Sequence, residues 1–332
     1  MPPSNMPVID VHTHMISDGW LDLLERHGQP QYHLATVKSG QRAIHMDGAP
    51  FMHLTPPMSD YDLRIRDMNA AGVDLAIVSL TCPNVYWGGP DVSSRAARLV
   101  NDSMADAQRH YPARIRWLAS LPWEYPDRAI AELDDACAKG AVGVMVIATV
   151  ATHSLTDERF APIWRAIDAR GLPVLCHPGA PPGLQHLDMG RFALVATVGF
   201  CMDTTLAVAR MIHAGFFDTY PNLKLIAAHG GGTLPYLAGR LDAWYQKVPA
   251  CSEFITKPPS EILRRIYFDT VVYRLDALRL CLDLAGPDNL MYGSDYPHMT
   301  GDMVGCLSRV NELPSTVARQ VAGQNAARIF KL

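Results

Sequence analysis

The chain has 332 residues, 48% of them hydrophobic, and a formal net charge of −4 at pH 7. This length permits two domains or one α/β barrel, and the apolar content is sufficient for a large core. The small negative charge and a pI near 6.3 argue against a polyanion-binding surface, so nucleic acid is not an expected partner.

The seven cysteines are scattered, without a C-x-x-C pair. An odd number of unclustered thiols is typical of a reduced, cytoplasmic protein rather than a disulfide framework. The first ten residues do not have the basic and apolar regions of a secretory signal. No run of 18 or more uncharged apolar residues occurs, so we expect no membrane span.

The first predicted strand covers residues 8–11, which include three β-branched apolar residues, and it runs directly into His12-Thr-His14. Because side chains alternate along a strand, His12 and His14 are expected on the same side, where both imidazoles can bind one metal ion. Two ligands do not complete a divalent site, and two structural histidines at a loop mouth are the alternative.

A long segment without strong periodicity follows, over residues 16–58. A segment of this kind is usually functional or disordered. Its aromatic residues and histidines favour an ordered flap, inserted after the first strand and lying over the site.

From residue 59 onward, predicted strands and helices alternate. Seven further strands are predicted at residues 73–80, 115–121, 142–148, 173–177, 223–229, 266–270 and 290–295. Helices are predicted at residues 59–72, 92–110, 127–139, 157–170, 204–214, 234–246, 275–284, 303–313 and 316–329. Eight strands separated by helices predict an α/β fold, a (β/α)8 TIM barrel formed by a single domain over residues 1–332. A doubly wound open sheet is the competitor, but Gly230-Gly-Gly232 does not have the spacing of a nucleotide-binding turn.

Chemically useful side chains stand at the ends of several predicted strands: His177 after the fifth, His229 after the sixth and Asp295 after the eighth. The carboxyl ends of barrel strands meet at one face, which is where catalytic groups lie. Each residue alone could be structural. Together with His12 and His14 they predict one site.

These motifs resemble the amidohydrolase superfamily: H-x-H after the first strand, His177, His229-Gly-Gly-Gly, and Gly-Ser-Asp295-Tyr-Pro. Within the superfamily, the chain is similar to the branch of aminocarboxymuconate-semialdehyde decarboxylase and related non-oxidative decarboxylases. The likeness extends over nearly the whole chain, including Asp-Leu-Arg-Ile-Arg-Asp-Met68 before the second strand and Pro-Tyr-Leu-Ala-Gly-Arg240 after the sixth.

The resemblance implies that His12, His14, His177 and Asp295 hold one divalent metal ion. Three imidazoles and one carboxylate suit Zn²⁺, with Mn²⁺ as the alternative. His229 matches the histidine that acts on the metal-bound water and the substrate, so His229 and Asp295 are the expected catalytic residues. Binuclear relatives use a lysine after the fourth strand, and residues 142–148 contain none, so one metal is expected.

The implied activity is that of a metal-dependent carboxy-lyase that releases CO₂ from a small carboxylic acid. The resemblance places a substrate-binding arginine where this chain has Met52, and methionine cannot pair with a carboxylate, which disfavours a dicarboxylic muconate. Trp20, Phe51, Met52 and Trp87 are expected to contact the substrate. These residues favour a hydroxybenzoate-like aromatic acid, with an enoic acid as the alternative.

Other functions remain open. The same mononuclear site suits a hydrolase acting on a lactone or an amide, or a hydratase. A non-catalytic metal-binding protein would require the loss of a ligand or of the proton-handling group, and all five positions are filled. The resemblance further implies a homodimer or a larger homo-oligomer.

Overall fold

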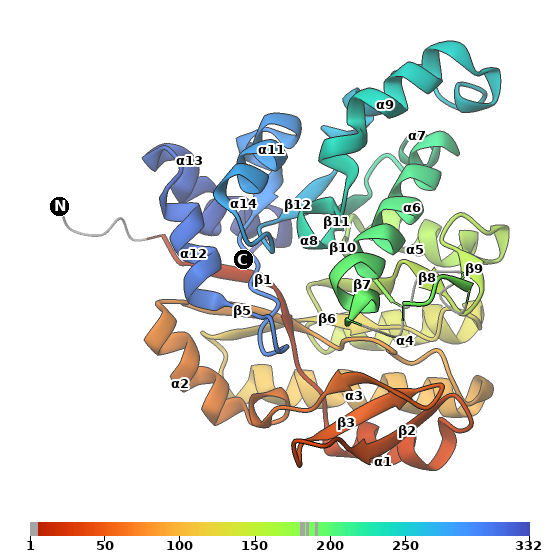
Figure 1. Cartoon of the computed structure of the whole chain (residues 1–332). Helices are drawn as coiled ribbons and strands as arrows, with labels where there is room; N and C mark the ends of the chain where they lie inside the picture. The colour runs from red at the N-terminus through yellow and green to blue at the C-terminus, as the bar shows by residue number, and fades with distance from the viewer. Residues whose placement is uncertain (1–5, 180–182, 184–185, 190–191) are drawn as a thin grey trace.

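The computed structural model describes residues 6–179, 183, 186–189 and 192–332. Eight strands form one sheet in the order β1-β5-β6-β7-β10-β11-β12-β13 (Figure 1). Every neighbouring pair in this sheet is parallel. The strands are β1 (Ile9–His14), β5 (Leu75–Ser79), β6 (Ile115–Ser120), β7 (Gly143–Ile147), β10 (Pro173–His177), β11 (Lys224–Ala227), β12 (Tyr267–Asp269) and β13 (Leu290–Met291). The predicted (β/α)8 TIM barrel is confirmed.

The barrel closes because the segment after β13 bonds back to β1. The Val11 N–H donates to the Tyr292 carbonyl at 3.0 Å, and the Asp295 N–H donates to the His12 carbonyl at 2.8 Å. Further along, Thr13 and Tyr296 form a parallel bridge. Closure therefore places Asp295 directly against the H-x-H segment.

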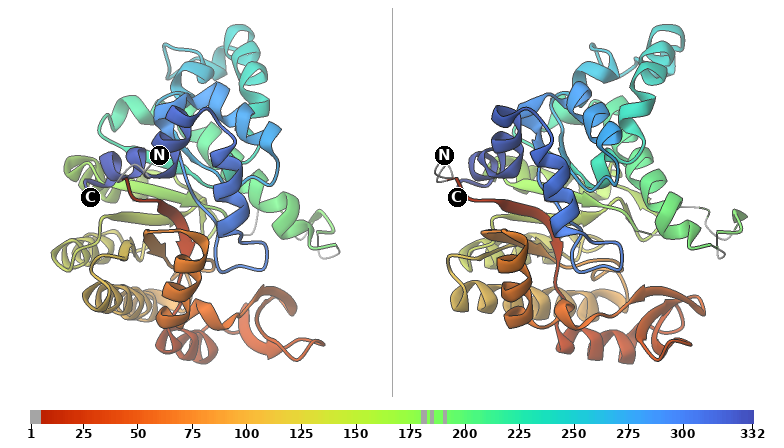
Figure 2. Two further views of the ribbon diagram at one scale, coloured as in Figure 1. Left: turned by 90° about the vertical axis from the view of Figure 1, so that its left-hand side faces the viewer. Right: turned by 60° about the vertical axis from the view of Figure 1, so that its left-hand side comes forward.

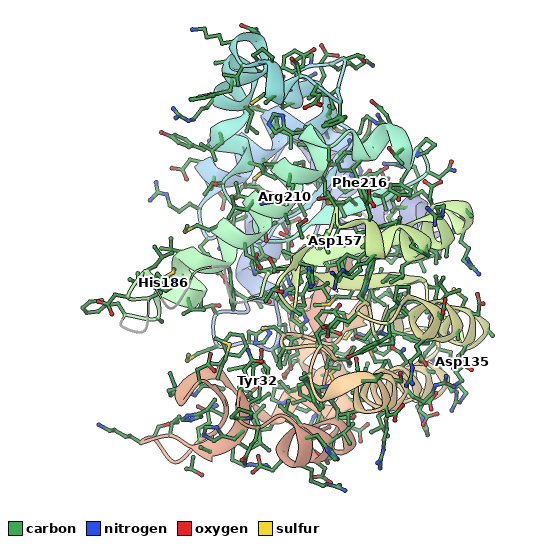
Figure 3. All side chains as sticks on the ribbon, turned by 90° about the vertical axis from the view of Figure 1, so that its right-hand side faces the viewer. Tyr32, Asp135, Asp157, His186, Arg210 and Phe216 are labelled. Atoms are coloured by element: carbon green, nitrogen blue, oxygen red, sulfur yellow. The ribbon has the colours of Figure 1, made fainter. Side chains whose placement is uncertain are left out.

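Each barrel strand is buried on both faces. On β7, for example, Met145 and Ile147 belong to the cluster inside the barrel, whereas Val144 and Val146 belong to the layer beneath the helices. Two-sided burial explains why the strands read as continuous apolar runs in the sequence. Figure 3 shows side chains filling the space between the helices and the sheet.

The helices surround the barrel: α2 (Tyr61–Ala71), α3 (Gly89–His110), α4 (Pro126–Ala138), α5 (Ala161–Arg170), α6 (Phe200–His213), α7 (Phe216–Thr219), α9 (Leu234–Lys247), α10 (Pro259–Leu263), α11 (Leu275–Ala285), α12 (Met303–Asn311), α13 (Ser315–Arg319) and α14 (Asn325–Phe330). Helix α2 begins two residues later than predicted, because Asp60 caps it by accepting a 2.8 Å hydrogen bond from the Leu63 N–H. The single helix predicted over residues 316–329 is divided into α13 and α14 by a π-helical turn.

Residues 16–58 are more regular than predicted. They contain α1 (Asp18–His27) and an antiparallel sheet of β2 (Tyr32–Thr36), β3 (Arg42–Met46) and β4 (Ala49–His53). Figure 2 shows this sheet on the same side of the barrel as the segment that leads into α6. Periodicity is weak in this part of the sequence because the three strands are short and only partly buried.

One helical stretch among the described residues, Val195–His213, is long and apolar enough to cross a membrane. It comprises the π-helical turn η4 (Val195–Gly199) and α6. The fold buries 44% of it, and a helix that covers a barrel meets the same criteria of length and composition. The stretch is weak evidence for a membrane span.

Candidate metal and catalytic site

The H-x-H motif lies at the carboxyl end of β1, where the strand contains a bulge. Its pairing with β5 shifts register between Asp10 and Thr13. Ile9 and Val11 belong to the interior cluster. After the bulge, the two imidazoles lie together, with 3.1 Å between the Nε2 atoms of His12 and His14.

The ring orientations of three histidines leave their Nε2 atoms free. Each Nδ1 faces an oxygen that can accept its proton: Asp269 Oδ2 for His12 at 2.6 Å, the Leu80 carbonyl for His14 at 3.3 Å and the Pro178 carbonyl for His177 at 2.8 Å. A proton on each Nδ1 leaves a lone pair on each Nε2. The buried Nε2 of His177 has no hydrogen-bond partner in the described part of the chain.

Asp295 completes this group. Its Oδ1 lies 3.4 Å from His12 Nε2 and 3.2 Å from His14 Nε2. One donor atom each from His12, His177, His229 and Asp295 lies within 4.8 Å of the others. Lone pairs and a carboxylate that converge without protons between them repel one another unless a cation is present. The donor set therefore fits a divalent metal ion.

The pKa shifts of His14, His177 and Asp295 agree with that interpretation. Burial lowers the pKa of His14 to about 3 and holds the pKa of His177 well below its usual value. Burial also disfavours the charged form of His12, but the adjacent Asp269 carboxylate outweighs it and raises the pKa of His12 to about 10. Burial alone would raise the pKa of Asp295, yet His298 and the adjacent imidazoles keep it well below its usual value. His14 and His177 are therefore neutral and Asp295 is ionised, which are the forms that bind metals. His12 has to release a proton when it binds a metal ion.

His229 follows β11 in a left-handed turn, with φ values of 56° at His229 and 60° at Gly230. Its Nε2 lies 3.6 Å from Asp295 Oδ2. Its ring is stacked towards Phe200, with 6.5 Å between the two ring centroids. A Cβ at residue 230 would lie 2.7 Å from Val272 Cγ1, so the turn needs glycine there for space as well as for conformation.

Asp269, at the end of β12, connects the H-x-H segment with the turn that carries His229. Besides facing His12, its carboxylate accepts hydrogen bonds from the N–H groups of His229 at 2.9 Å, Gly230 at 2.8 Å and Val271 at 3.0 Å. Asp269 could in principle orient an imidazole or start a loop. The structure shows that one carboxylate does both.

His298 also lies beside the histidine cluster. Its Nε2 lies 2.9 Å from Thr81 Oγ1, and its ring centroid lies 4.9 Å from that of His14. Donor atoms of His14, Asp295 and His298 form a second potential metal-binding group. Its position three residues after Asp295 was the only signal in the sequence.

Of the four expected substrate contacts, the structure brings only Phe51 towards the interior of the barrel. Its ring lies 6.3 Å from that of Phe200, which in turn stacks on His229. Trp20, Met52 and Trp87 instead pack in the hydrophobic layer outside the barrel, each less than 7% exposed. A contact of these three side chains with the substrate stays a prediction.

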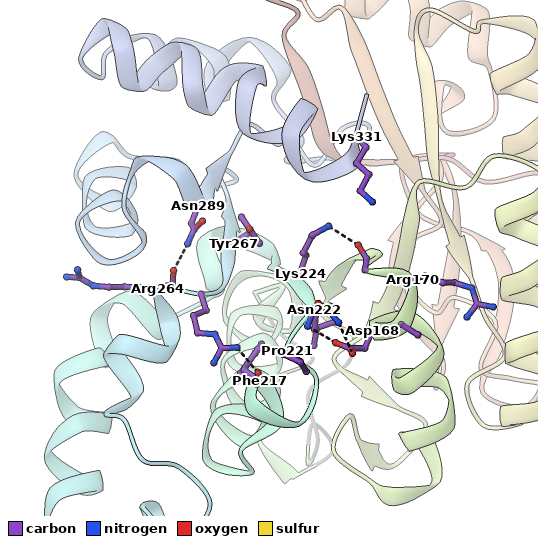
Figure 4. Close-up of a pocket in the computed structure, with 14 residues that line it drawn as sticks. Asp168, Arg170, Phe217, Pro221, Asn222, Lys224, Arg264, Tyr267, Asn289 and Lys331 are labelled. Carbon is purple, nitrogen blue, oxygen red and sulfur yellow. Dashed lines mark hydrogen bonds between the residues drawn. The ribbon is translucent and has the colours of Figure 1, made fainter.

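A hollow of about 720 Å³ lies at the opposite end of the barrel, where β10, β11 and β12 begin (Figure 4). Its lining includes Lys224, Arg265 and Lys331 but none of the expected site residues. Because barrel enzymes carry their active sites at the carboxyl ends of the strands, this hollow is not the catalytic site.

Comparisons with known proteins agree with this geometry. A 2-amino-3-carboxymuconate-6-semialdehyde decarboxylase from Dictyostelium discoideum is 29% identical over 334 residues, which cover 98% of this chain and 91% of that protein. A 6-methylsalicylic acid decarboxylase from Penicillium expansum is 28% identical over 338 residues, covering 98% and 96%. A solved structure of a 5-carboxyvanillate decarboxylase variant from Novosphingobium aromaticivorans, with bound manganese and 3-methoxy-4-hydroxy-5-nitrobenzoic acid, is 25% identical with a TM-score of 0.86, covering 99% and 98%. The family model described as amidohydrolase matches residues 9–332, and the chain therefore belongs to the amidohydrolase family.

Proposed function

We propose that this amidohydrolase is a metal-dependent, non-oxidative decarboxylase of a hydroxybenzoate-like acid. The observation that carries the proposal is that His229 lies beside Asp295, next to the other three imidazoles of the site. Relatives that match 98% of this chain are named decarboxylases. The cluster alone would also suit a hydrolase or hydratase, so the relatives decide between the two classes.

His12, His14, His177 and Asp295 are the proposed ligands of a single divalent ion. The ion would act as a Lewis acid towards oxygen atoms of the substrate. We propose Zn²⁺ because of the three imidazoles, with Mn²⁺ as the alternative because one relative holds manganese. Elemental analysis of the protein purified without chelator distinguishes the two ions, and the absence of both would count against this assignment.

His229 is the proposed proton donor. Its imidazolium form delivers a proton to the ring carbon that bears the carboxylate. The bond between this carbon and the carboxylate then breaks, its electrons return to the ring and CO₂ leaves. Asp295 Oδ2 lies 3.6 Å from His229 Nε2 and would orient the imidazole for the transfer. A ring hydroxyl increases the electron density at the carbon that is protonated, which is why we favour hydroxybenzoates.

The test is CO₂ release from a panel of hydroxybenzoates, measured beside the hydrolysis of lactones and amides. We expect His229→Ala to bind metal as the native protein does and to lose at least about a hundredfold in kcat, since a positioned acid contributes about 10²–10⁴-fold. Hydrolysis without CO₂ release would establish the alternative function. A near-native rate in His229→Ala would remove His229 from the mechanism.

We further propose a cytoplasmic homodimer or larger homo-oligomer. Val198, Met202 and Leu206 are 37–51% exposed and follow one another at four-residue spacing on one helical face. All seven cysteines are unpaired, as a reducing compartment requires. Sedimentation of the native protein and of Leu206→Lys tests the assembly, and a native monomer would refute it.

A further inference from the structure

Asn84, in the loop after β5, is held in a conformation that non-glycine residues rarely adopt. Its φ is 58°, and the residue is completely buried. Its N–H donates to the Thr81 carbonyl at 2.9 Å. Its carbonyl accepts two indole N–H groups, from Trp20 at 3.1 Å and from Trp87 at 2.9 Å. Three hydrogen bonds therefore determine this one backbone position, and strained positions of this kind gather at functional sites.

The Asn84 side chain does not satisfy its own polar groups. Nδ2 faces the Met145 sulfur at 3.0 Å, which is a weak acceptor, and the buried Oδ1 has no partner among the described residues. Asn101 provides the contrast, because it is equally buried but bonds through both ends of its amide: Oδ1 accepts from the Ser120 N–H, and Nδ2 donates to the Ser120 carbonyl and to Glu132. An unsatisfied buried acceptor is costly to stability, so a structural role does not explain Asn84.

The loop that carries Asn84 also contacts the histidine cluster. It begins at Leu80, whose carbonyl faces His14, and Thr81 contacts His298. At the other end, the Asn84 amide reaches Met145, which lies in the barrel interior two residues before Ile147. Ile147 is in register with His177. The unpaired Oδ1 thus belongs to the carboxyl end of the barrel, where the proposed reaction takes place.

We propose that Asn84 determines substrate specificity by accepting a hydrogen bond, through Oδ1, from a hydroxyl group on the aromatic ring of the substrate. This inference rests on the proposed function. Trp20 and Trp87 are positioning residues, since their indoles hold the Asn84 backbone. A site that is built to bond a hydroxyl rejects the analogue without it, because the buried acceptor is then left unpaired.

Asn84→Gly is the most direct test, since glycine adopts the left-handed conformation without strain and removes only the amide. Dissociation constants of benzoate and of the three monohydroxybenzoates are measured on the metal-loaded enzyme. In the native protein we expect at least one hydroxybenzoate to bind about 10- to 100-fold more tightly than benzoate. In Asn84→Gly that preference should fall to within about threefold.

Two further variants control for folding. Asn84→Asp keeps an acceptor oxygen, so it should keep the preference for the hydroxyl even if it binds every carboxylate more weakly. Asn101→Ala removes a satisfied amide, so it should lower the melting temperature and leave the preference intact. A preference that survives in Asn84→Gly overturns the role of Asn84 while the decarboxylase remains. A native protein that neither binds nor decarboxylates any hydroxybenzoate overturns the proposed function, and the inference with it.

Discussion

Replacing Asp269 by asparagine tests whether this one buried carboxylate positions both His12 and the turn that carries His229. Asp269 Oδ2 lies 2.6 Å from His12 Nδ1 and 2.9 Å from the His229 nitrogen, and Oδ1 accepts from two further N–H groups. Asparagine has a single acceptor oxygen. Its NH₂ group must therefore face either His12 and His229, or Gly230 and Val271.

Both orientations are unfavourable. An NH₂ group facing His12 donates to Nδ1, which moves the ring proton to Nε2 and removes the lone pair needed for a metal. An NH₂ group facing Gly230 and Val271 leaves two buried N–H groups without an acceptor, at about 1–3 kcal/mol each. Loss of the partner that orients a metal-binding histidine typically lowers metal affinity about 10- to 100-fold, or about 1.4–2.8 kcal/mol.

The assay has two measurements on the same preparation. Chelator competition gives the metal dissociation constant, and urea denaturation of the metal-free protein gives the free energy of unfolding. We expect Asp269→Asn to weaken metal binding about 10- to 100-fold and to lower the free energy of unfolding by at least about 1 kcal/mol. Asp203→Asn is the control for metal affinity, because Asp203 is 1% exposed and hydrogen-bonded but belongs to α6 and has no contact with the imidazoles among the interactions described. Native metal affinity and native stability in Asp269→Asn would refute the reasoning.

Two further substitutions have calculable effects. Burial raises the pKa of Asp203 to about 6 from 3.8, so the stability this group contributes is present below pH 4 and lost as pH rises through 6. Asparagine keeps only one of the two acceptor oxygens that Asp203 offers to Thr149 and Gly179, and this loss is the same at every pH. The free energy of unfolding of Asp203→Asn relative to the native protein should therefore rise by about 1 kcal/mol from pH 5 to pH 7.5 in urea denaturation, and an unchanged difference would contradict this. The buried guanidinium of Arg64 bonds Thr13 Oγ1 at 2.6 Å and the His14 carbonyl, and it stacks on Tyr296 at 4.8 Å. A lysine ammonium cannot make all these contacts at once, so Arg64→Lys should lower the free energy of unfolding by about 2–3 kcal/mol in urea denaturation. A loss below about 0.5 kcal/mol would show that the contacts are not stabilising.

The barrel could be predicted because its signals are local. Runs such as residues 142–148 are apolar throughout, which indicates strands buried on both faces, and glycines mark the ends of the helices between them. The antiparallel sheet of residues 32–53 could not be predicted, since its strands are short and partly exposed.

The order of strands along the chain is enough to predict that His12, His14, His177, His229 and Asp295 stand at strand ends and meet at one face. What those side chains can do depends on contacts that form on folding. The orientation of the His12 ring depends on its contact with Asp269, which lies 257 residues away in the chain. Likewise, the sequence does not show that the indole N–H groups of Trp20 and Trp87 donate to the Asn84 carbonyl. Local patterns report burial and periodicity, whereas the direction of a lone pair depends on partners that only folding brings within hydrogen-bond distance.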